Sequence, residues 1–233
     1  MIYAFGDSYA AYSSNVFQGR DRIEGIDPNL ERDLLIKKTK SYIDHVSDYT
    51  QQKIGHLGNC GRGPLDMVQQ FFDFDREKIL EEDILIFCWS GMERDIDKWG
   101  DPYIDPKYDN TRYEGDDMQR YKDAVKLYHL FLASPMQHKQ SMLSSLLAID
   151  GMLDEVKTKN IFHFSCFEHE LAYINEHYKF ANGHYETEWC LFDHARTFDD
   201  YGVDGVDDLE YPCHYSPKGS IGLANYIYEK VIK

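Results

Sequence analysis

MIYAFGDSY, residues 1–9, opens the chain with five consecutive apolar residues that run directly into glycine, aspartate and serine. A short apolar run that stops at such turn residues predicts a strand buried on both faces, as in a parallel sheet. Ligands of open α/β sheets gather outside the carboxyl ends of such strands. The sequence therefore places Ser8 at a strand-to-helix turn, where a nucleophile of an α/β enzyme belongs.

Further strands and helices alternate along the rest of the chain. The apolar run at 84–88 lies between acidic residues and Ser90-Gly91, which predicts another buried strand. Shorter apolar runs predict strands at 53–57 and 160–167, and 189–192 is a candidate for an additional one. Apolar residues spaced three and four apart predict helices whose buried faces are Tyr42, Val46 and Tyr49; Met118, Tyr121, Val125, Tyr128 and Leu132; Met142, Leu146, Ile149, Leu153 and Val156; and Ile221, Ala224, Tyr228 and Val231. This order predicts a three-layer α/β/α sandwich with a mainly parallel, flavodoxin-like sheet of about five strands.

The length and composition fit one globular domain. The chain has 233 residues, of which 42% are hydrophobic and 15% aromatic, enough for one α/β core. We therefore expect a single domain over 1–233. Two polar stretches, at about 13–40 and 97–117, lack periodicity and are too long for plain connections. We interpret both as insertions, the first beside the site and the second at the surface as a candidate lid.

The charge balance argues against some classes of partner. Lysine and arginine number 25 against 41 aspartates and glutamates, which gives a formal net charge of −16 at pH 7. Such a field repels phosphate backbones and anionic membrane surfaces, so we expect no nucleic-acid partner and no membrane partner. No apolar run approaches the roughly 18 residues of a membrane span, and no basic segment precedes the first strand, so we expect no signal peptide and synthesis in the cytoplasm. The five irregularly spaced cysteines are expected to stay reduced, without disulfides.

The other end of the chain supplies a histidine in a comparable position. Cys213–Gly219 reads CHYSPKG and places His214 just before a proline that opens a helix. Gly-Asp-Ser after an N-terminal strand, together with His-x-Ser-Pro-x-Gly before a C-terminal helix, resembles the SGNH (GDSL-type) hydrolase family. Gly58–Gly63 resembles the second block of that family, and Trp89–Arg94 lies where its third block is expected. The resemblance spans nearly the whole chain.

The resemblance implies that Ser8 is a nucleophile and His214 its base. A serine hydroxyl attacks when a base within hydrogen-bond reach takes its proton, and an imidazole suits that role at neutral pH. The family stabilises the resulting oxyanion with the N–H of the serine, with a glycine N–H, here Gly61 or Gly63, and with an asparagine side chain. Neighbouring side chains are expected to contact the substrate, and they are Asp7, Tyr9, Asn59, Trp89 and Ser90.

The third block departs from the family pattern. It normally reads Gly-x-Asn-Asp, whereas Gly91–Arg94 reads Gly-Met-Glu-Arg and offers no asparagine. Arg94 is a candidate replacement donor to the oxyanion, and Ser90 is a second candidate. An ion pair between Arg94 and a neighbouring acid is an equally good interpretation.

The last block departs as well. The family's aspartate three residues before the histidine is Tyr211 here. Asp208 is our candidate for the acid that orients His214, with Glu210 or a backbone carbonyl as alternatives. Because a triad without its orienting acid loses orders of magnitude in rate, this departure bears on activity itself.

Two clusters of metal-type ligands have a structural alternative. The pattern His163-x-x-Cys166-x-x-His169 overlaps a predicted strand, on which residues 163 and 169 share one face and residue 166 the other, a poor arrangement for tetrahedral zinc. A looser set consists of His184, Cys190 and His194. Because His and Cys on core strands are usually structural, we expect no metal and no cofactor.

These observations predict a serine esterase of SGNH type that removes an acyl group, most simply O-acetyl, from a carbohydrate or another small ester. The alternative is a catalytically decayed SGNH-like domain that serves as a binding or structural module, for example a phage virion component released by lysis. The missing asparagine and aspartate favour that alternative. A flavodoxin-like binder that holds an anion at the first loop is a third hypothesis. The sequence does not set the oligomeric state.

Overall fold

The computed structural model describes residues 1–6, 10, 40–58, 63–91, 119–120, 123, 127, 135–166, 170–176, 178–196 and 217–233. Its strands form one five-stranded sheet in the order β2-β1-β3-β4-β5, and every neighbouring pair is parallel. The strands are β1 (Ile2–Gly6), β2 (Ile54–His56), β3 (Ile84–Trp89), β4 (Asn160–Ser165) and β5 (His184–Tyr185). This flavodoxin-like strand order confirms the predicted sheet.

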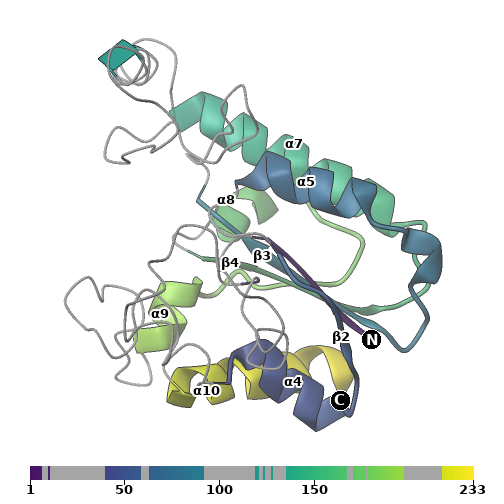
Figure 1. The fold of residues 1–233 in the computed structure, drawn as a ribbon. Coiled ribbons are helices and arrows are strands. Elements are labelled where there is room, and N and C mark those ends of the chain that lie inside the picture. Colours follow the sequence, from purple (N-terminus) through teal and green to yellow (C-terminus); the bar gives the residue numbers. More distant parts are fainter. Residues whose placement is uncertain are drawn as a thin grey trace.

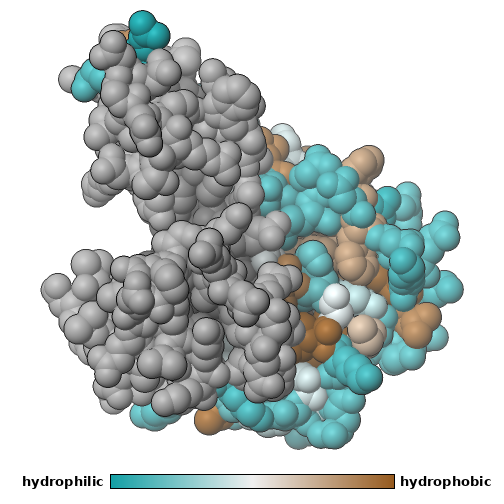
Figure 2. Space-filling view, viewed as in Figure 1, coloured by the Kyte–Doolittle hydropathy of each residue, from teal (hydrophilic) through white to brown (hydrophobic). Residues whose placement is uncertain are grey.

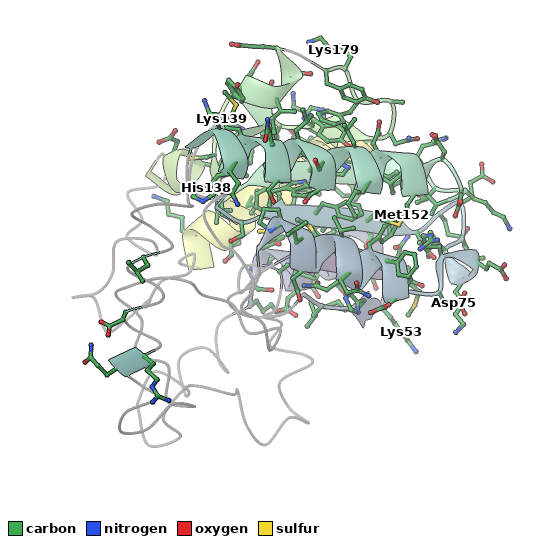
Figure 3. All side chains as sticks on the ribbon, turned by 90° about the horizontal axis from the view of Figure 1, so that it is seen from above. Lys53, Asp75, His138, Lys139, Met152 and Lys179 are labelled. Atoms are coloured by element: carbon green, nitrogen blue, oxygen red, sulfur yellow. The ribbon has the colours of Figure 1, made fainter. Side chains whose placement is uncertain are left out.

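Helices cover both faces of the sheet, which makes the predicted three-layer sandwich (Figure 1). One face carries α5 (Pro64–Asp73), α7 (Pro135–Leu153) and α8 (Glu170–Asn175), and the other carries α4 (Tyr42–Thr50), α9 (Leu191–Arg196) and α10 (Pro217–Ile227). Two short segments are the 3₁₀ turn η1 (Arg76–Lys78) and the π-helical η2 (Tyr228–Ile232). Seen from above, α7 lies beside α5, with His138 and Lys139 toward one end of α7 and Met152 toward the other (Figure 3).

Alternate side chains of the strands enter two separate cores, as the two-residue period of a strand requires. Ala4 and Ile86 pack with α4 and α10, and the rest of that core includes Ile2, Ile43, Val46, Ile84, Phe162, Phe164, Leu223 and Ile227. Phe5 and Phe87 pack with α5 and α7, and the rest of that core includes Met67, Phe71, Leu85, Met142, Leu146, Ile149 and Ile161. The sheet is therefore buried on both faces, as the continuous apolar runs predict.

Aromatic rings stack in register across the sheet on the α5 and α7 side. Phe5, Phe87, His163 and Tyr185 occupy paired positions of β1, β3, β4 and β5. Their successive ring centroids lie 5.2, 4.6 and 3.9 Å apart, and the rings are within 19° of parallel. Cross-strand pairs of this kind stabilise a particular strand register.

The first described helix, α4, begins at a capping box. The Ser41 hydroxyl accepts from the Asp44 N–H at 3.3 Å, and the Asp44 carboxylate accepts from the Ser41 N–H at 2.8 Å. Tyr42 and Val46 are buried as predicted, but Tyr49 is 38% exposed and contacts Tyr228 edge to face. The predicted stripe is therefore core only over its first two residues.

The helix faces predicted near the C-terminus are confirmed in one case and shifted in the other. Met142, Leu146, Ile149, Leu153 and Val156 are all buried. In α10 the buried residues include Ser220, Leu223, Ala224 and Ile227, whereas Ile221 is 41% exposed. Of the predicted stripe, Ala224 is buried and Val231 is partly buried against the same core, whereas the sheet otherwise takes residues adjacent to the predicted ones.

The fifth strand lies at a different place from the one considered. Residues 189–192 do not form a strand, because Leu191 begins the helix α9. The strand is His184–Tyr185, which pairs with Phe162 and His163 of β4 after the positive φ of Gly183. A two-residue strand carries no periodicity, and a short apolar run fits a buried helix as well as a strand.

Several sequence predictions concern other parts of the chain. The insertions at 13–40 and 97–117 and most of the 118–132 helix lie outside the described residues. Within the described part, no helix is long and apolar enough to cross a membrane. Hydrophilic side chains cover most of the coloured surface in Figure 2, which agrees with a mean hydropathy of −0.58.

Candidate functional site

The sheet order reverses at the carboxyl ends of β1 and β3. From β1 the chain continues to β2 on one side of the sheet and then to β3 on the other. In open α/β sheets, such a reversal opens a crevice between the loops that leave the two central strands. Gly6 ends β1, and Trp89 ends β3, so the residues that follow them lie at this edge.

Gly6 allows β1 to approach β3 more closely than any other residue would. Its φ is +138°, and an added Cβ would lie 2.2 Å from the carbonyl oxygen of Cys88. Other side chains rarely adopt this φ, and a backbone oxygen cannot move aside cheaply. The Gly-Asp-Ser sequence therefore begins with a glycine that the local geometry requires.

Gln70 holds the backbone of Gly6 from α5. Its side-chain Nε2 donates to the Gly6 carbonyl at 3.2 Å, and its Oε1 accepts from the Gly6 N–H at 3.3 Å. The same Nε2 also donates to the carboxylate of Asp66 at 2.5 Å, one helical turn earlier. Sequence reasoning missed the pair formed by Gln70 and Asp66. The only available signal was that two polar residues lie four apart on the helix that follows the second block.

Two glycines of the second block lie at the same edge. An added Cβ on Gly58 would lie 2.6 Å from the Gly6 carbonyl oxygen, and the Gly58 N–H donates to the Ala10 carbonyl at 3.0 Å. Gly63 is buried and is the N-cap of α5, followed by Pro64 at the first helical position. The segment that joins β2 to α5 therefore begins beside Gly6 and ends at the N-cap of α5.

Trp89 lies in the core on the α5 and α7 side. It is fully buried, and its indole N–H donates to Nδ1 of His163 at 3.2 Å. In the described part of the chain Trp89 is a core residue, and its contact with substrate stays a prediction. His163 is also buried in the ring stack, and burial lowers its pKa well below the ordinary value. Its neutral imidazole accepts the indole hydrogen bond.

Ser90 is the first residue after β3 and its hydroxyl is buried. The residue is 1% exposed, and Oγ has no hydrogen-bond partner in the part of the chain that the structure describes. A buried hydroxyl without a partner costs about 1–3 kcal/mol, so each instance calls for an explanation. Among the candidate oxyanion donors that lie in the described part, Ser90 is the side chain with unused donor capacity.

The remaining predicted site residues lie outside the described residues. They are Asp7, Ser8, Tyr9, Asn59, Gly61, Arg94, Asp208 and His214. Described residues lie close in sequence to several of them. Gly6 and the helical Ala10 bracket Ser8 in sequence, and α10 begins three residues after His214.

Two members of the first possible metal cluster lie in different cores of the sandwich. His163 lies in the core beside α7, whereas Cys166 lies in the core beside α10, so the two side chains occupy opposite faces of the sheet, as the strand period predicts. Within the described ranges, no group of three or more His, Cys, Asp or Glu side chains is arranged to hold a metal ion.

Beside His184 of the second possible cluster, the described chain holds a buried carboxylate, Glu186. Glu186 accepts from the Tyr226 hydroxyl, from the Glu188 N–H at 2.8 Å and from His184 at 3.5 Å. Burial acts to raise the pKa of Glu186, but these hydrogen bonds outweigh it and lower the pKa. Sequence reasoning found no signal for Glu186, whose hydrogen bonds connect His184 of β5 with Tyr226 of α10.

Comparisons of the chain with protein-family models, with curated proteins and with solved structures gave no significant match.

Proposed function

We propose that the protein is a serine ester hydrolase of SGNH type, with Ser8 as nucleophile and His214 as base. The observation that carries the proposal is the reversal of strand order between β1 and β3, with Ser8 two residues after the end of β1. This is the position at which doubly wound α/β proteins bind their ligands. The resemblance in the Gly-Asp-Ser and His-x-Ser-Pro-x-Gly segments supports the same assignment.

The turn before Ser8 has the properties that a nucleophile requires. Gly6 ends a buried strand with a positive φ, and Ala10 is already helical, so the chain passes from strand to helix between these two residues, and Ser8 lies between them in sequence. In other α/β hydrolases, a sharp strand-to-helix turn presents the nucleophile above the sheet. The hydrogen bonds from Gln70 fix the start of this connection, and rigid support of that kind keeps a reacting group in place.

Ser90 is the donor that we assign in place of the missing asparagine. Gly6 pairs with Cys88 in the sheet, and Ser90 directly follows the end of β3, so Ser90 lies at the edge from which the chain leads to Ser8. Its buried hydroxyl lacks a partner among the described residues, and therefore gains a hydrogen bond when an oxyanion forms. Donors that are fixed in advance toward developing charge are usually the largest catalytic contribution.

The reaction then follows the acyl-enzyme course. His214 takes the proton of Ser8 as its oxygen attacks the ester carbonyl, and the tetrahedral oxyanion accepts hydrogen bonds from backbone N–H groups and Ser90. The imidazolium returns the proton to the departing alcohol. Water, deprotonated by the same imidazole, releases the acid and restores the serine.

The substrate class that we propose is a small or carbohydrate ester, most simply an O-acetyl ester. A net charge of −16 disfavours polyanionic substrates, since the field of the protein repels them. The competing proposal is a decayed binding module, for which the residues found at the asparagine and aspartate positions, Glu93 and Tyr211, are the specific observation.

Hydrolysis of 4-nitrophenyl acetate and release of acetate from acetylated sugars test the function. Ser8→Ala and His214→Ala should each lower turnover by at least about a thousandfold. Ser144→Ala, which alters an exposed serine of α7, is the matched control and should keep full turnover. Undiminished hydrolysis in folded Ser8→Ala would refute the nucleophile, and a folded wild type without hydrolysis would favour the binding module.

A further inference from the structure

Two thiols from neighbouring strands lie in contact just below the carboxyl edge of the sheet. Cys88 belongs to β3 and Cys166 directly follows β4, and their Sγ atoms are 3.0 Å apart. The Cys166 N–H donates to the Trp89 carbonyl at 2.8 Å, which joins the two strand ends. A disulfide bond is about 2.05 Å long, so the two sulfurs are about 1 Å farther apart than bonded sulfurs.

The surroundings of the two thiols decide which reagent reaches them. Both residues are fully buried in the core that α4 and α10 share with the sheet. Burial at this depth excludes bulky disulfides such as oxidised glutathione. A small neutral oxidant is therefore the class of reagent that fits this site.

We propose that Cys88 and Cys166 are a redox-convertible pair that a peroxide oxidises to an intramolecular disulfide. One thiol reduces hydrogen peroxide, which gives a sulfenic acid and one water. The sulfur of the second thiol then attacks the sulfenic sulfur, the S–S bond forms, and a second water leaves. Overall, two thiols are oxidised to a disulfide and one peroxide is reduced to two waters. In a reducing cytosol the pair remains a dithiol, as the sequence predicts for these cysteines.

The bond would link β3 to β4 beside the switch point. Cys88 pairs with Gly6 in the sheet, so the sulfur pair lies next to the last residue of β1, from which the chain leads to Ser8. The two cysteines are 78 residues apart in the chain. Closing a loop of that length restricts the unfolded chain and raises the midpoint of thermal unfolding by about 5–10 °C when the native geometry accepts the bond.

The test treats the full-length wild type with hydrogen peroxide under native conditions and traps the remaining thiols with an alkylating reagent. Peptide mapping without reductant should find the Cys88–Cys166 cross-link as the dominant disulfide, and a reductant should reverse it. The oxidised protein should show the predicted rise in unfolding midpoint. Dominant pairing of other cysteines, irreversible sulfinic or sulfonic products at this pair, or a fall in unfolding midpoint would overturn the proposal.

Matched variants separate this pair from the remaining thiols. Cys88→Ser and Cys166→Ser should each abolish the cross-link, whereas Cys190→Ser, another buried cysteine, should leave it unchanged. Because buried substitutions can impair folding, circular dichroism checks each variant, and Cys166→Ala serves if the serine variant unfolds. The mapping of the wild type stands independently of all of them.

Discussion

The side-chain amide of Gln70 is hydrogen-bonded to both the N–H and the carbonyl of Gly6, at 3.3 and 3.2 Å. This joins the end of β1 to α5, the helix that follows the second sequence block. Because Ser8 lies two residues after Gly6 in the sequence, we expect the position of the proposed nucleophile to depend on Gln70. The contact therefore makes the helix a part of the proposed site.

Replacement of Gln70 tests that dependence. Gln70→Ala removes both hydrogen bonds, so we expect a loss of about 1–2 kcal/mol in the free energy of unfolding. Ester hydrolysis should fall by at least about tenfold, since a displaced reacting group loses rate steeply. Urea unfolding and 4-nitrophenyl acetate turnover measure the two effects. The matched control is Gln69→Ala, an exposed neighbour that bonds Asp73, and equal effects from both variants would contradict a specific role.

Gly6→Ala should be the most destabilising single change at this edge. The new Cβ would collide with the Cys88 carbonyl oxygen and impose a side chain on a φ of +138°. We expect a loss of about 2–4 kcal/mol in the free energy of unfolding. Gly151→Ala is the opposite case, because nothing lies within 4 Å of the added Cβ on α7, and it should stabilise by about 0.5–1 kcal/mol. A tolerated Gly6→Ala would show that β1 ends differently.

Ser90→Ala separates a catalytic hydroxyl from a structural one. Since Oγ is buried without a partner in the described chain, its removal should not lower the free energy of unfolding and should raise it by up to about 1–3 kcal/mol. Loss of an oxyanion donor should lower kcat by about 10²–10³. The matched control is Ser145→Ala on α7, because this serine is equally buried and also lacks a described partner. Unchanged kcat in folded Ser90→Ala would remove Ser90 from the mechanism.

The buried His163 makes stability depend on pH. Burial holds its pKa in the folded state well below the ordinary value of 6.5, so the unfolded chain binds a proton first as pH falls. Its contribution is present above about pH 6.5 and is lost below, with a slope of at most about 1.4 kcal/mol per pH unit. Urea unfolding of wild type and His163→Phe between pH 7.5 and 5 should show a flatter dependence in the variant. Parallel profiles would contradict this account.

The parts of the fold that the sequence predicted are those whose signal is local and repeated. The apolar run at 84–88 and the stripe from Met142 to Leu153 are long enough to define β3 and α7. Tyr49 and Ile221 were assigned to buried faces on spacing alone, and tertiary packing chose adjacent residues instead. The two-residue β5 carries no periodic signal, because its pairing with β4 defines it.

In the candidate site, too, residues with a local sequence signal were predicted, and residues whose role depends on long-range packing were not. Glycines and serines at strand ends were visible as turn residues, which is why Gly63 and Ser90 were candidates before their burial was known. The role of Gln70 depends on where α5 packs against β1, and that of Glu186 on where α10 meets β5. Neither packing arrangement is encoded in the residues next to the side chain, so local reasoning could not find them.

The most direct test of the account is covalent labelling by a small fluorophosphonate, read as intact mass and then mapped to a peptide. The reagent reacts with an activated serine whatever the natural substrate is. We predict one adduct, located on Ser8, that is absent in Ser8→Ala, strongly reduced in His214→Ala and retained in Ser144→Ala. Folded wild type that stays unlabelled, or an adduct on another serine, would contradict the assignment of Ser8 as the nucleophile.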